Sequence, residues 1–153
     1  MPLEIERKFL VNKDLLPALD EGVVVRQAYL SFAPAPTVRI RIWGEKAFIT
    51  IKGQVNGISR SEFEYEIPYI DAVNLLQLAV TNQVEKVRKF YSFNGKKWEI
   101  DFFEGTNKGL ILAEVELDCE NEQVDLPEWI EKEVSNDIRY FNSQLALSPF
   151  NQW

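Results

Sequence analysis

The first residues that could do chemistry lie near the start of the chain, where charged and apolar residues alternate. In "EIERKF", residues 4–9, Glu4, Glu6 and Lys8 are spaced two apart. Side chains alternate between the two faces of a β-strand, so these three would share one face. Like charges that close repel by roughly a kcal/mol or more at an effective dielectric of about 20. We therefore expect either that water screens this face or that a group of opposite charge binds to it.

The same alternation recurs along the chain and is the dominant pattern of the sequence. In "TVRIRIW", Arg39 and Arg41 lie on one face and three apolar residues on the other. Period-two alternation of this kind indicates β-strands with one polar face. It predicts eight strands, at residues 3–11, 24–32, 37–43, 46–53, 59–68, 86–93, 97–105 and 110–118.

The charges on these faces are more concentrated than a solvated sheet requires. For any one strand, the simplest interpretation is an antiparallel sheet with one wet face. Solvated faces usually carry scattered charges with Ser and Thr between them, but here pairs of like charges fall in the middle of several strands. We therefore expect the charged faces to meet in a common site.

A closed barrel of eight antiparallel strands would bring these faces together around an interior that holds one small ligand. The expected fold class is α+β dominated by β, with the apolar faces outward and covered by helices near 71–80 and 127–147. The basic lining would be Lys8, Arg39, Arg41, Lys52, Arg60, Lys86 and Arg88. The acidic lining would be Glu4, Glu6, Glu62, Glu64, Asp101, Glu114 and Glu116.

This lining indicates a metal–phosphate site. Isolated buried charges cost several kcal/mol each even after relaxation, so about seven charges of each sign require water, ions and a polyanion between them. Arginine forks match phosphate oxygens in pairs, and lysine adds a point charge. Clustered carboxylates suit a hard ion such as Mg²⁺ or Mn²⁺. The chain has no histidine, which excludes Ser-His and Cys-His nucleophiles and the usual zinc sites.

Composition sets the remaining expectations. The 153 residues, 46% hydrophobic and 27% charged, fit a single domain over 1–153. One cysteine, no signal-peptide pattern and no apolar run of about 18 residues favour the cytoplasm and argue against a membrane protein. The net charge of −7 argues against binding to a nucleic-acid duplex. The sequence leaves open whether the protein is a monomer or a homodimer.

The ordered motifs resemble those of a known family. Glu4-Ile5-Glu6-Arg7-Lys8 looks like the ExExK signature of the CYTH superfamily, the triphosphate tunnel metalloenzymes. The resemblance runs from about Leu3 to about Ala146, through "RIR", "TIKG", "SRSEFEYEI", Lys86-x-Arg88, "WEIDFFEG" and "LAEVEL". It implies an eight-stranded antiparallel tunnel that binds a triphosphate with a divalent metal, and a closing segment in which a helix lies by one tunnel mouth.

The resemblance also implies roles for the charged residues. Phosphates would be held by Lys8, Arg39, Arg41, Lys52, Lys86 and Arg88, with a less defined role for Arg60. Metal ions, two per site, would be bound by Glu4, Glu6, Glu62, Glu64, Glu114 and Glu116, with Asp101 close by. The candidate catalytic residues are Lys8 together with Glu4 or Glu114, either of which would orient the attacking water.

The expected function is metal-dependent hydrolysis of the terminal phosphoanhydride of inorganic triphosphate. The chain offers no insertion that would build a nucleoside or thiamine pocket. The alternatives are a class IV-type adenylate cyclase and a module that binds polyphosphate or nucleotide without turnover. A cyclase would need an aromatic shelf for the purine. Phe32, Trp43 and Trp98 are present, and we interpret them as outer packing.

Overall fold

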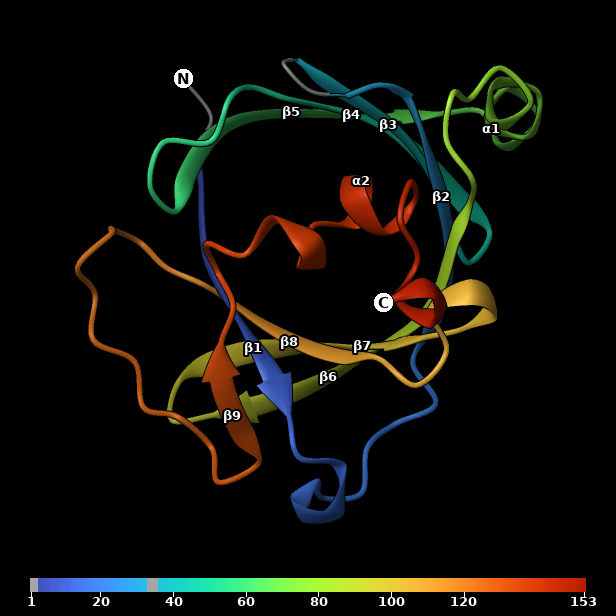
Figure 1. Ribbon diagram of the computed structural model, residues 1–153. Coiled ribbons are helices and arrows are strands. Elements are labelled where there is room, and N and C mark those ends of the chain that lie inside the picture. Colours follow the sequence, from blue (N-terminus) through green and yellow to red (C-terminus); the bar gives the residue numbers. More distant parts are fainter. Residues whose placement is uncertain (1–2, 33–35) are drawn as a thin grey trace.

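β-Strands are the main secondary structure of the chain. The computed structural model describes residues 3–32 and 36–153 (Figure 1). The strands in these residues are β1 (Leu3–Val11), β2 (Val23–Ser31), β3 (Thr37–Trp43), β4 (Lys46–Lys52), β5 (Ser59–Ile67), β6 (Val84–Phe93), β7 (Lys96–Phe103), β8 (Ile111–Glu116) and β9 (Ile130–Glu133). The helices are α1 (Tyr69–Leu76) and α2 (Asn142–Leu145), with 3₁₀ turns at Lys13–Leu15, Gly105–Asn107, Ile138–Tyr140 and Phe150–Gln152. No helix in this part of the chain has the length and apolar character needed to span a membrane.

Eight of the strands close into an antiparallel barrel, which confirms the predicted architecture. The strand order is β5-β4-β3-β2-β6-β7-β8-β1, and β5 then pairs with β1, where Glu4 lies opposite Arg60. Figure 1 shows the resulting ring nearly along its axis. The β6–β7 hairpin turns at Asn94 and Gly95, which both have positive φ, as the Asn-Gly pair predicts.

The strand register sets charged side chains of opposite sign directly across from one another inside the ring. Lys8 lies opposite Glu114, and Arg88 lies opposite Asp101. Lys52 is opposite Glu62 in the same way. Directly opposed residues in an antiparallel pair interact most strongly, so the register itself neutralises part of the interior charge.

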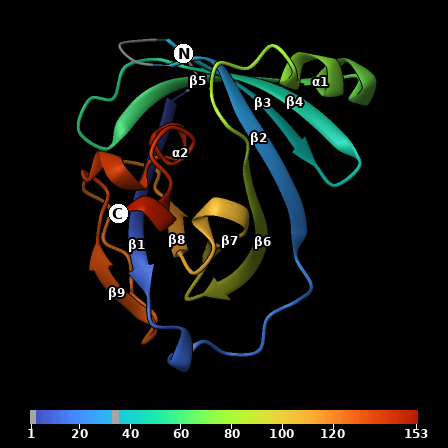
Figure 2. The ribbon, with the colours of Figure 1, turned by 45° about the vertical axis from the view of Figure 1, so that its right-hand side comes forward.

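Apolar side chains lie on the outer faces of the strands, and other parts of the chain cover them. Helix α1 packs on β2, β3 and β4, where Ala72 and Leu76 bury the outer side chain of Ile40 (Figures 1 and 2). This confirms the helix predicted near 71–80. A second cluster covers β1, β7 and β8, with Trp98 and Trp129 at its centre. Trp98 therefore belongs to the outer packing, as expected.

The prediction of helices over 127–147 on the outside of the barrel is wrong. Residues 130–133 form β9, and helix occurs only at Asn142–Leu145. One edge of β1 pairs with β5 over residues 3–5 and then with β9 from Phe9 to Val11. Since unpaired strand groups need hydrogen-bond partners, that edge selects a strand at 130–133 over a helix.

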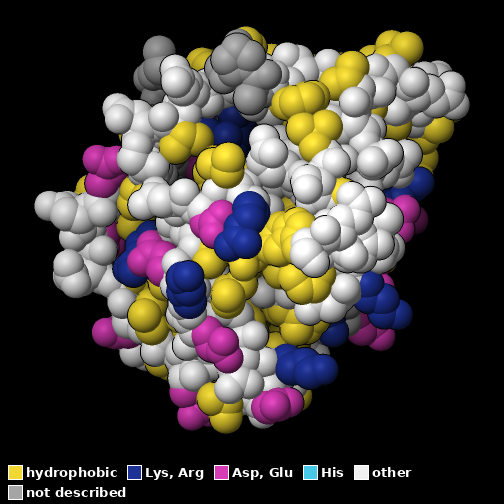
Figure 3. All heavy atoms as spheres, viewed as in Figure 1, with side chains coloured by type: hydrophobic (Ala, Val, Ile, Leu, Met, Phe, Trp, Pro, Cys, Tyr) yellow, Lys and Arg dark blue, Asp and Glu magenta, His cyan; other side chains and the backbone are white. Residues whose placement is uncertain are grey.

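The segment after β9 enters the barrel instead of lying on its surface. Figures 1 and 2 show α2 within the ring formed by the strands. Tyr140, Leu145 and Ala146 are buried there against Val84, Phe103 and Leu112. The space-filling view from the same direction as Figure 1 shows atoms over most of the centre of the ring (Figure 3). The C-terminal segment, residues 134–153, thus covers one end of the barrel.

Candidate active site

The interior of the barrel contains a cavity of about 490 Å³. Twelve of the fourteen predicted lining residues are in its wall: Glu4, Glu6, Lys8, Arg39, Arg41, Lys52, Arg60, Glu62, Glu64, Arg88, Glu114 and Glu116. The two predicted residues that are not in its wall are Lys86 and Asp101. Alternation along the strands therefore identifies most of the wall, because every second side chain points inward.

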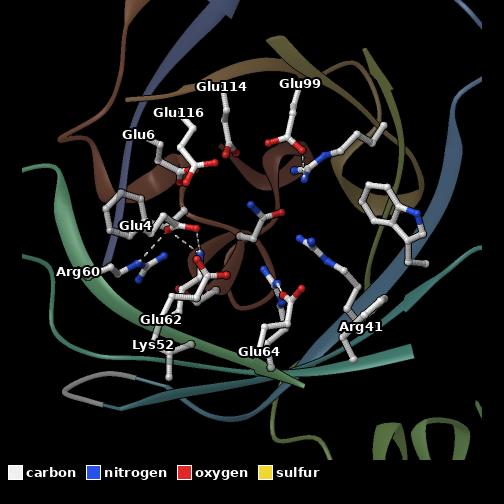
Figure 4. A pocket seen from close by; sticks show the side chains of 18 of the residues that line it. Glu4, Glu6, Arg41, Lys52, Arg60, Glu62, Glu64, Glu99, Glu114 and Glu116 are labelled. Carbon is white, nitrogen blue, oxygen red and sulfur yellow. Dashed lines mark hydrogen bonds and ion pairs between the residues drawn. The ribbon is translucent and has the colours of Figure 1, made fainter. Parts of the chain in front are cut away.

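The acidic residues gather on one wall. All six glutamates named above come from β5, β1 and β8, which are adjacent because β5 pairs with β1. Figure 4 shows Glu6, Glu114 and Glu116 close together, with Arg41 across the cavity. Barrel closure therefore separates an acidic wall from a wall that carries the arginines of β3 and β6.

One acidic pair lies where β1 meets β5. Lys52 Nζ donates hydrogen bonds to both carboxylate oxygens of Glu4, at 2.8 and 3.0 Å. Burial raises the pKa of Glu4, but the charge of Lys52 and hydrogen bonds from Glu62 and Lys52 outweigh it and lower the pKa to about 2. Burial and the hydrogen bond with Glu4 raise the pKa of Glu62 to about 7. Near neutral pH, Glu4 is therefore ionised and Glu62 carries a proton for part of the time.

A second acidic pair lies between β1 and β8. Glu114 is buried and lies 3.8 Å from Lys8 Nζ. Burial raises its pKa, but the charges of Lys8 and Arg88 and a hydrogen bond from Glu6 hold it well below the usual value. Burial, and then the charges of Glu114 and Glu4, raise the pKa of Glu6 well above its usual value. Each pair thus combines one ionised carboxylate with one carboxyl that retains a proton.

The arginines of β3 form much of the opposite wall. Arg41 Nε donates to Gln27 Oε1 at 2.8 Å, and burial together with Arg39 and Arg88 lowers its pKa to about 9. Arg39 Nη2 donates to Thr50 at 3.1 Å. Arg39 Nε is buried without a hydrogen-bond partner among the described residues. A buried donor without a partner costs about 1–3 kcal/mol, so an oxygen-rich anion in the cavity would suit this wall.

Arg88 joins the cavity to a buried ion-pair network behind it. Its Nε and Nη2 donate to the two oxygens of Asp101 at 2.7 and 2.8 Å, and its Nη1 donates to Glu99 at 2.8 Å. Lys86 Nζ donates to Asp101 at 2.8 Å, and its side chain is fully buried. Because Lys86 and Arg88 occupy both oxygens of Asp101, this carboxylate supports the site from outside the cavity.

The C-terminal segment supplies the covered end of the cavity. Lys8 Nζ donates to the backbone oxygen of Tyr140 at 3.1 Å. The Phe141 ring lies under Lys8 Nζ and Arg60 Cζ, 5.4 and 5.9 Å from its centroid. Phe141, Asn142 and Ser143 line the cavity. The C-terminal segment therefore fills space inside the barrel and closes this end of the cavity.

Sequence reasoning missed several residues of the wall. Glu99 lines the cavity but was not among the predicted lining residues. It lies two residues from Asp101, on the same face of β7. Trp43 also lines it, so the interpretation of Trp43 as outer packing is wrong. The alternation that places Arg39 and Arg41 inward places Trp43 inward as well and would have identified it. Nothing near Phe141 in the sequence indicates that residue 141 enters the barrel.

The acidic wall has the chemistry of a site for divalent cations, although its side chains are turned to other partners. No group of three acidic side chains in residues 3–32 and 36–153 is arranged to hold a metal ion as it stands. Glu4 faces Lys52, and Glu64 accepts a hydrogen bond from Thr50 at 2.8 Å. Burial is the main cause of the raised pKa of Glu6, and the charges of Glu114 and Glu4 add to it, so the carboxylates of this wall repel one another. An all-oxygen set of carboxylates that repel one another fits Mg²⁺ or Mn²⁺, provided that the carboxylates rotate.

Comparison with known proteins identifies the family. The sequence matches the CYTH domain over residues 2–148. The chain belongs to the CYTH family. This confirms the family inferred from ExExK and the motifs that follow it. Members of the family generally depend on divalent metal ions, in keeping with the oxygen-rich acidic wall.

The CYTH domain described here is similar to two bacterial proteins and one solved structure that carry the same name. The inorganic triphosphatase of Acetivibrio thermocellus is 43% identical over 154 residues, which cover 100% of this chain and 99% of that protein. The inorganic triphosphatase of Nitrosomonas europaea is 36% identical, covering 95% and 97% of the two chains. The crystal structure of an inorganic triphosphatase superimposes with a TM-score of 0.69 at 34% identity and covers 97% of each chain.

Proposed function

We propose that this CYTH domain hydrolyses the terminal phosphoanhydride of inorganic triphosphate to pyrophosphate and phosphate, with Mg²⁺ or Mn²⁺, two ions per site. The observation that carries the proposal is the division of one cavity into an acidic wall on β5, β1 and β8 and a wall rich in arginine. A protein that only bound phosphate would gain no affinity from the six glutamates, because they repel the ligand. The names of the relatives support the same activity.

The basic side chains would bind the phosphates. Arg39, Arg41 and Arg88 present guanidinium groups from β3 and β6, and Lys8, Lys52 and Arg60 add charge from the other side. Arginine forks match phosphate oxygens, and fixed cations stabilise the charge that grows on the bridging oxygen as the bond to the terminal phosphorus breaks. Lys86, which the sequence placed among the phosphate ligands, would act from behind through Asp101.

The acidic wall would hold the metal ions and orient the attacking water. Glu4, Glu6, Glu62, Glu64, Glu114 and Glu116 are the proposed ligands, and Asp101 would support Arg88 instead. Metal ions bound there would neutralise phosphate charge and lower the pKa of the attacking water. Glu4 and Glu114 are ionised near neutral pH, so either can accept a hydrogen bond from that water and orient it toward the terminal phosphorus.

The direct test is to measure phosphate release from inorganic triphosphate, ATP and thiamine triphosphate side by side. Reactions contain Mg²⁺, Mn²⁺ or EDTA, and cyclic AMP is assayed in the ATP reactions. We expect metal-dependent release that is fastest from inorganic triphosphate. Tight triphosphate binding without release would identify a binding module, and cyclic AMP formation would identify a cyclase. Activity that persists in EDTA would contradict the role of the acidic wall.

A further inference from the structure

Asn142 lies in the cavity wall and also bonds to the buried network behind it. It is the first residue of α2 and one of the residues that line the cavity. Its Oδ1 accepts a hydrogen bond from Lys86 Nζ at 3.0 Å. A lysine ammonium group has three donors and no acceptor, so only the amide oxygen of Asn142 can face it. The bond to Lys86 therefore fixes which way the amide group points.

The amide nitrogen of Asn142 is consequently a donor that this network leaves unused. The nitrogen and oxygen of an amide point in different directions from the same carbon, so the –NH₂ group is turned away from Lys86. Nδ2 donates no hydrogen bond to any other described residue. The side chain is half-buried and borders the cavity. A neutral pair of N–H donors is thus available at the covered end of the cavity.

The surroundings hold this amide in place. Lys86 is fixed on its other side by Asp101, at 2.8 Å. Helix α2 is anchored by Leu145 and Ala146, each 1% exposed in the apolar cluster at this end of the barrel. Binding groups are most effective when packing and neighbouring hydrogen bonds fix them before the ligand arrives. Asn142 meets that condition through both its backbone and its side chain.

We propose that Asn142 is a substrate-binding residue whose side-chain –NH₂ group donates a hydrogen bond to a phosphate oxygen of the triphosphate at the end of the cavity covered by the C-terminal segment. The inference rests on the proposed triphosphate site and adds a contact from outside the eight barrel strands. The contact brings no further charge to a cavity whose other phosphate ligands are cations. It also gives the C-terminal segment a direct part in recognising the substrate.

The Asn142→Asp variant separates this role from a purely structural one. Aspartate has nearly the same shape and keeps an oxygen for Lys86, so the bond to the buried network is preserved. It replaces the –NH₂ donor by a carboxylate oxygen, which repels phosphate. We expect the melting temperature to be maintained and the affinity for inorganic triphosphate to fall at least about tenfold, as for loss of a hydrogen bond to a charged group. Affinity is measured by titration calorimetry in EDTA, and KM in Mg²⁺.

A matched control variant makes the same amide-to-carboxylate substitution at another position of α2. Gln144 is in α2, two residues from Asn142, and does not line the cavity. Gln144→Glu therefore adds one negative charge without removing a donor from the site. We expect its triphosphate affinity to stay within about twofold of the wild type, because this side chain is partly exposed and outside the cavity wall, where water and salt screen its charge. Equal weakening by both variants would attribute the effect to long-range repulsion and overturn the inference.

The wild-type protein distinguishes failure of the inference from failure of the proposed function. Tight triphosphate binding by the wild type together with unchanged binding by Asn142→Asp would overturn the inference alone. A wild-type protein that neither binds nor hydrolyses inorganic triphosphate would overturn the proposed function and the inference with it. Weakening confined to Asn142→Asp, with the fold intact, would support the assignment.

Discussion

Arg88 and Asp101 form a two-point ion pair in the interior of the barrel, with Nε–Oδ1 and Nη2–Oδ2 distances of 2.7 and 2.8 Å. Both side chains are nearly inaccessible to solvent. Lys86 shares the same carboxylate, so one aspartate pairs with two cations. Burial alone would raise the pKa of Asp101, but Arg88 and Lys86 lower it to about 2. The geometry of Arg88 at the cavity therefore depends on a residue outside it.

Replacement of Asp101 by asparagine is expected to destabilise the protein strongly. The variant removes the negative charge that Lys86 and Arg88 share, and removing one partner of a buried ion pair typically costs about 3–5 kcal/mol. The free energy of unfolding is measured by urea denaturation. Asp137→Asn is the matched control, because Asp137 pairs with Arg139 at 2.7 Å on the surface, where such pairs contribute about 0–1 kcal/mol. Equal losses in the two variants would contradict the supporting role of Asp101.

Glu62 is expected to make stability depend on pH between its unfolded and folded pKa values. Its pKa rises from 4.5 to about 7 on folding, so the folded state binds the proton more tightly. This contribution is complete below pH 4.5, declines as the pH rises and is lost above about pH 7. Glu62→Gln should therefore be more stable than the wild type above pH 7, by on the order of 1–2 kcal/mol after allowance for solvent screening.

The measurement for Glu62 is urea denaturation of both proteins from pH 4 to pH 8. The difference between them should grow as the pH rises and level off above pH 7. The pKa of Glu4 is lowered to about 2, so its contribution is present above pH 4.5 and is lost as the pH falls toward 2. A constant difference between the two proteins across the range would show that Glu62 does not titrate as described.

Metal binding is expected to release protons. Burial, and then the neighbouring ionised carboxylate, raise the pKa values of Glu6 and Glu62. Metal ligands must be deprotonated. Titration of Mg²⁺ or Mn²⁺ near pH 6 in buffers of different ionisation enthalpy should give heats that differ between buffers. Glu6→Gln should reduce the number of protons released. Heats that are independent of the buffer would rule out this linkage.

The sequence predicts the faces of the strands well because alternation is a local property. Arg39 and Arg41 point inward for the same geometric reason as Glu4 and Glu6, and eight such runs suffice to predict the barrel. Alternation does not say how deep in the barrel a residue lies or what covers it. Asp101 is on the inward face as expected, but Arg88 and Lys86 enclose it.

The parts that sequence reasoning missed depend on contacts between distant segments. Strand β9 forms because β1 has a free edge after its pairing with β5 ends, and no local pattern at 130–133 reports that edge. Asn142 reaches the cavity because Leu145 and Ala146 are buried inside the barrel instead of on its outer surface. A local apolar pattern is the same in either case, so only the assembled barrel shows which side the segment packs against.

Trp43 is expected to position two phosphate-binding arginines. The Cζ atoms of Arg41 and Arg88 lie 5.9 and 5.8 Å from its ring centroid. Each cation–π contact is worth about 0.5–2 kcal/mol, so Trp43→Ala should raise the KM for triphosphate about 3- to 30-fold with a smaller change in kcat. Trp43→Phe keeps an aromatic face and should restore most of the affinity.

The control for Trp43 is another tryptophan beside an arginine. Arg139 Cζ lies 5.1 Å from the ring centroid of Trp153, and Trp153 does not line the cavity. Trp153→Ala should leave KM unchanged, because the cation that it contacts is outside the phosphate site. If Trp43→Ala and Trp43→Phe raise KM equally, the ring contributes shape rather than its charge distribution. If neither variant changes KM, Arg41 and Arg88 are held by Gln27, Asp101 and Glu99 alone.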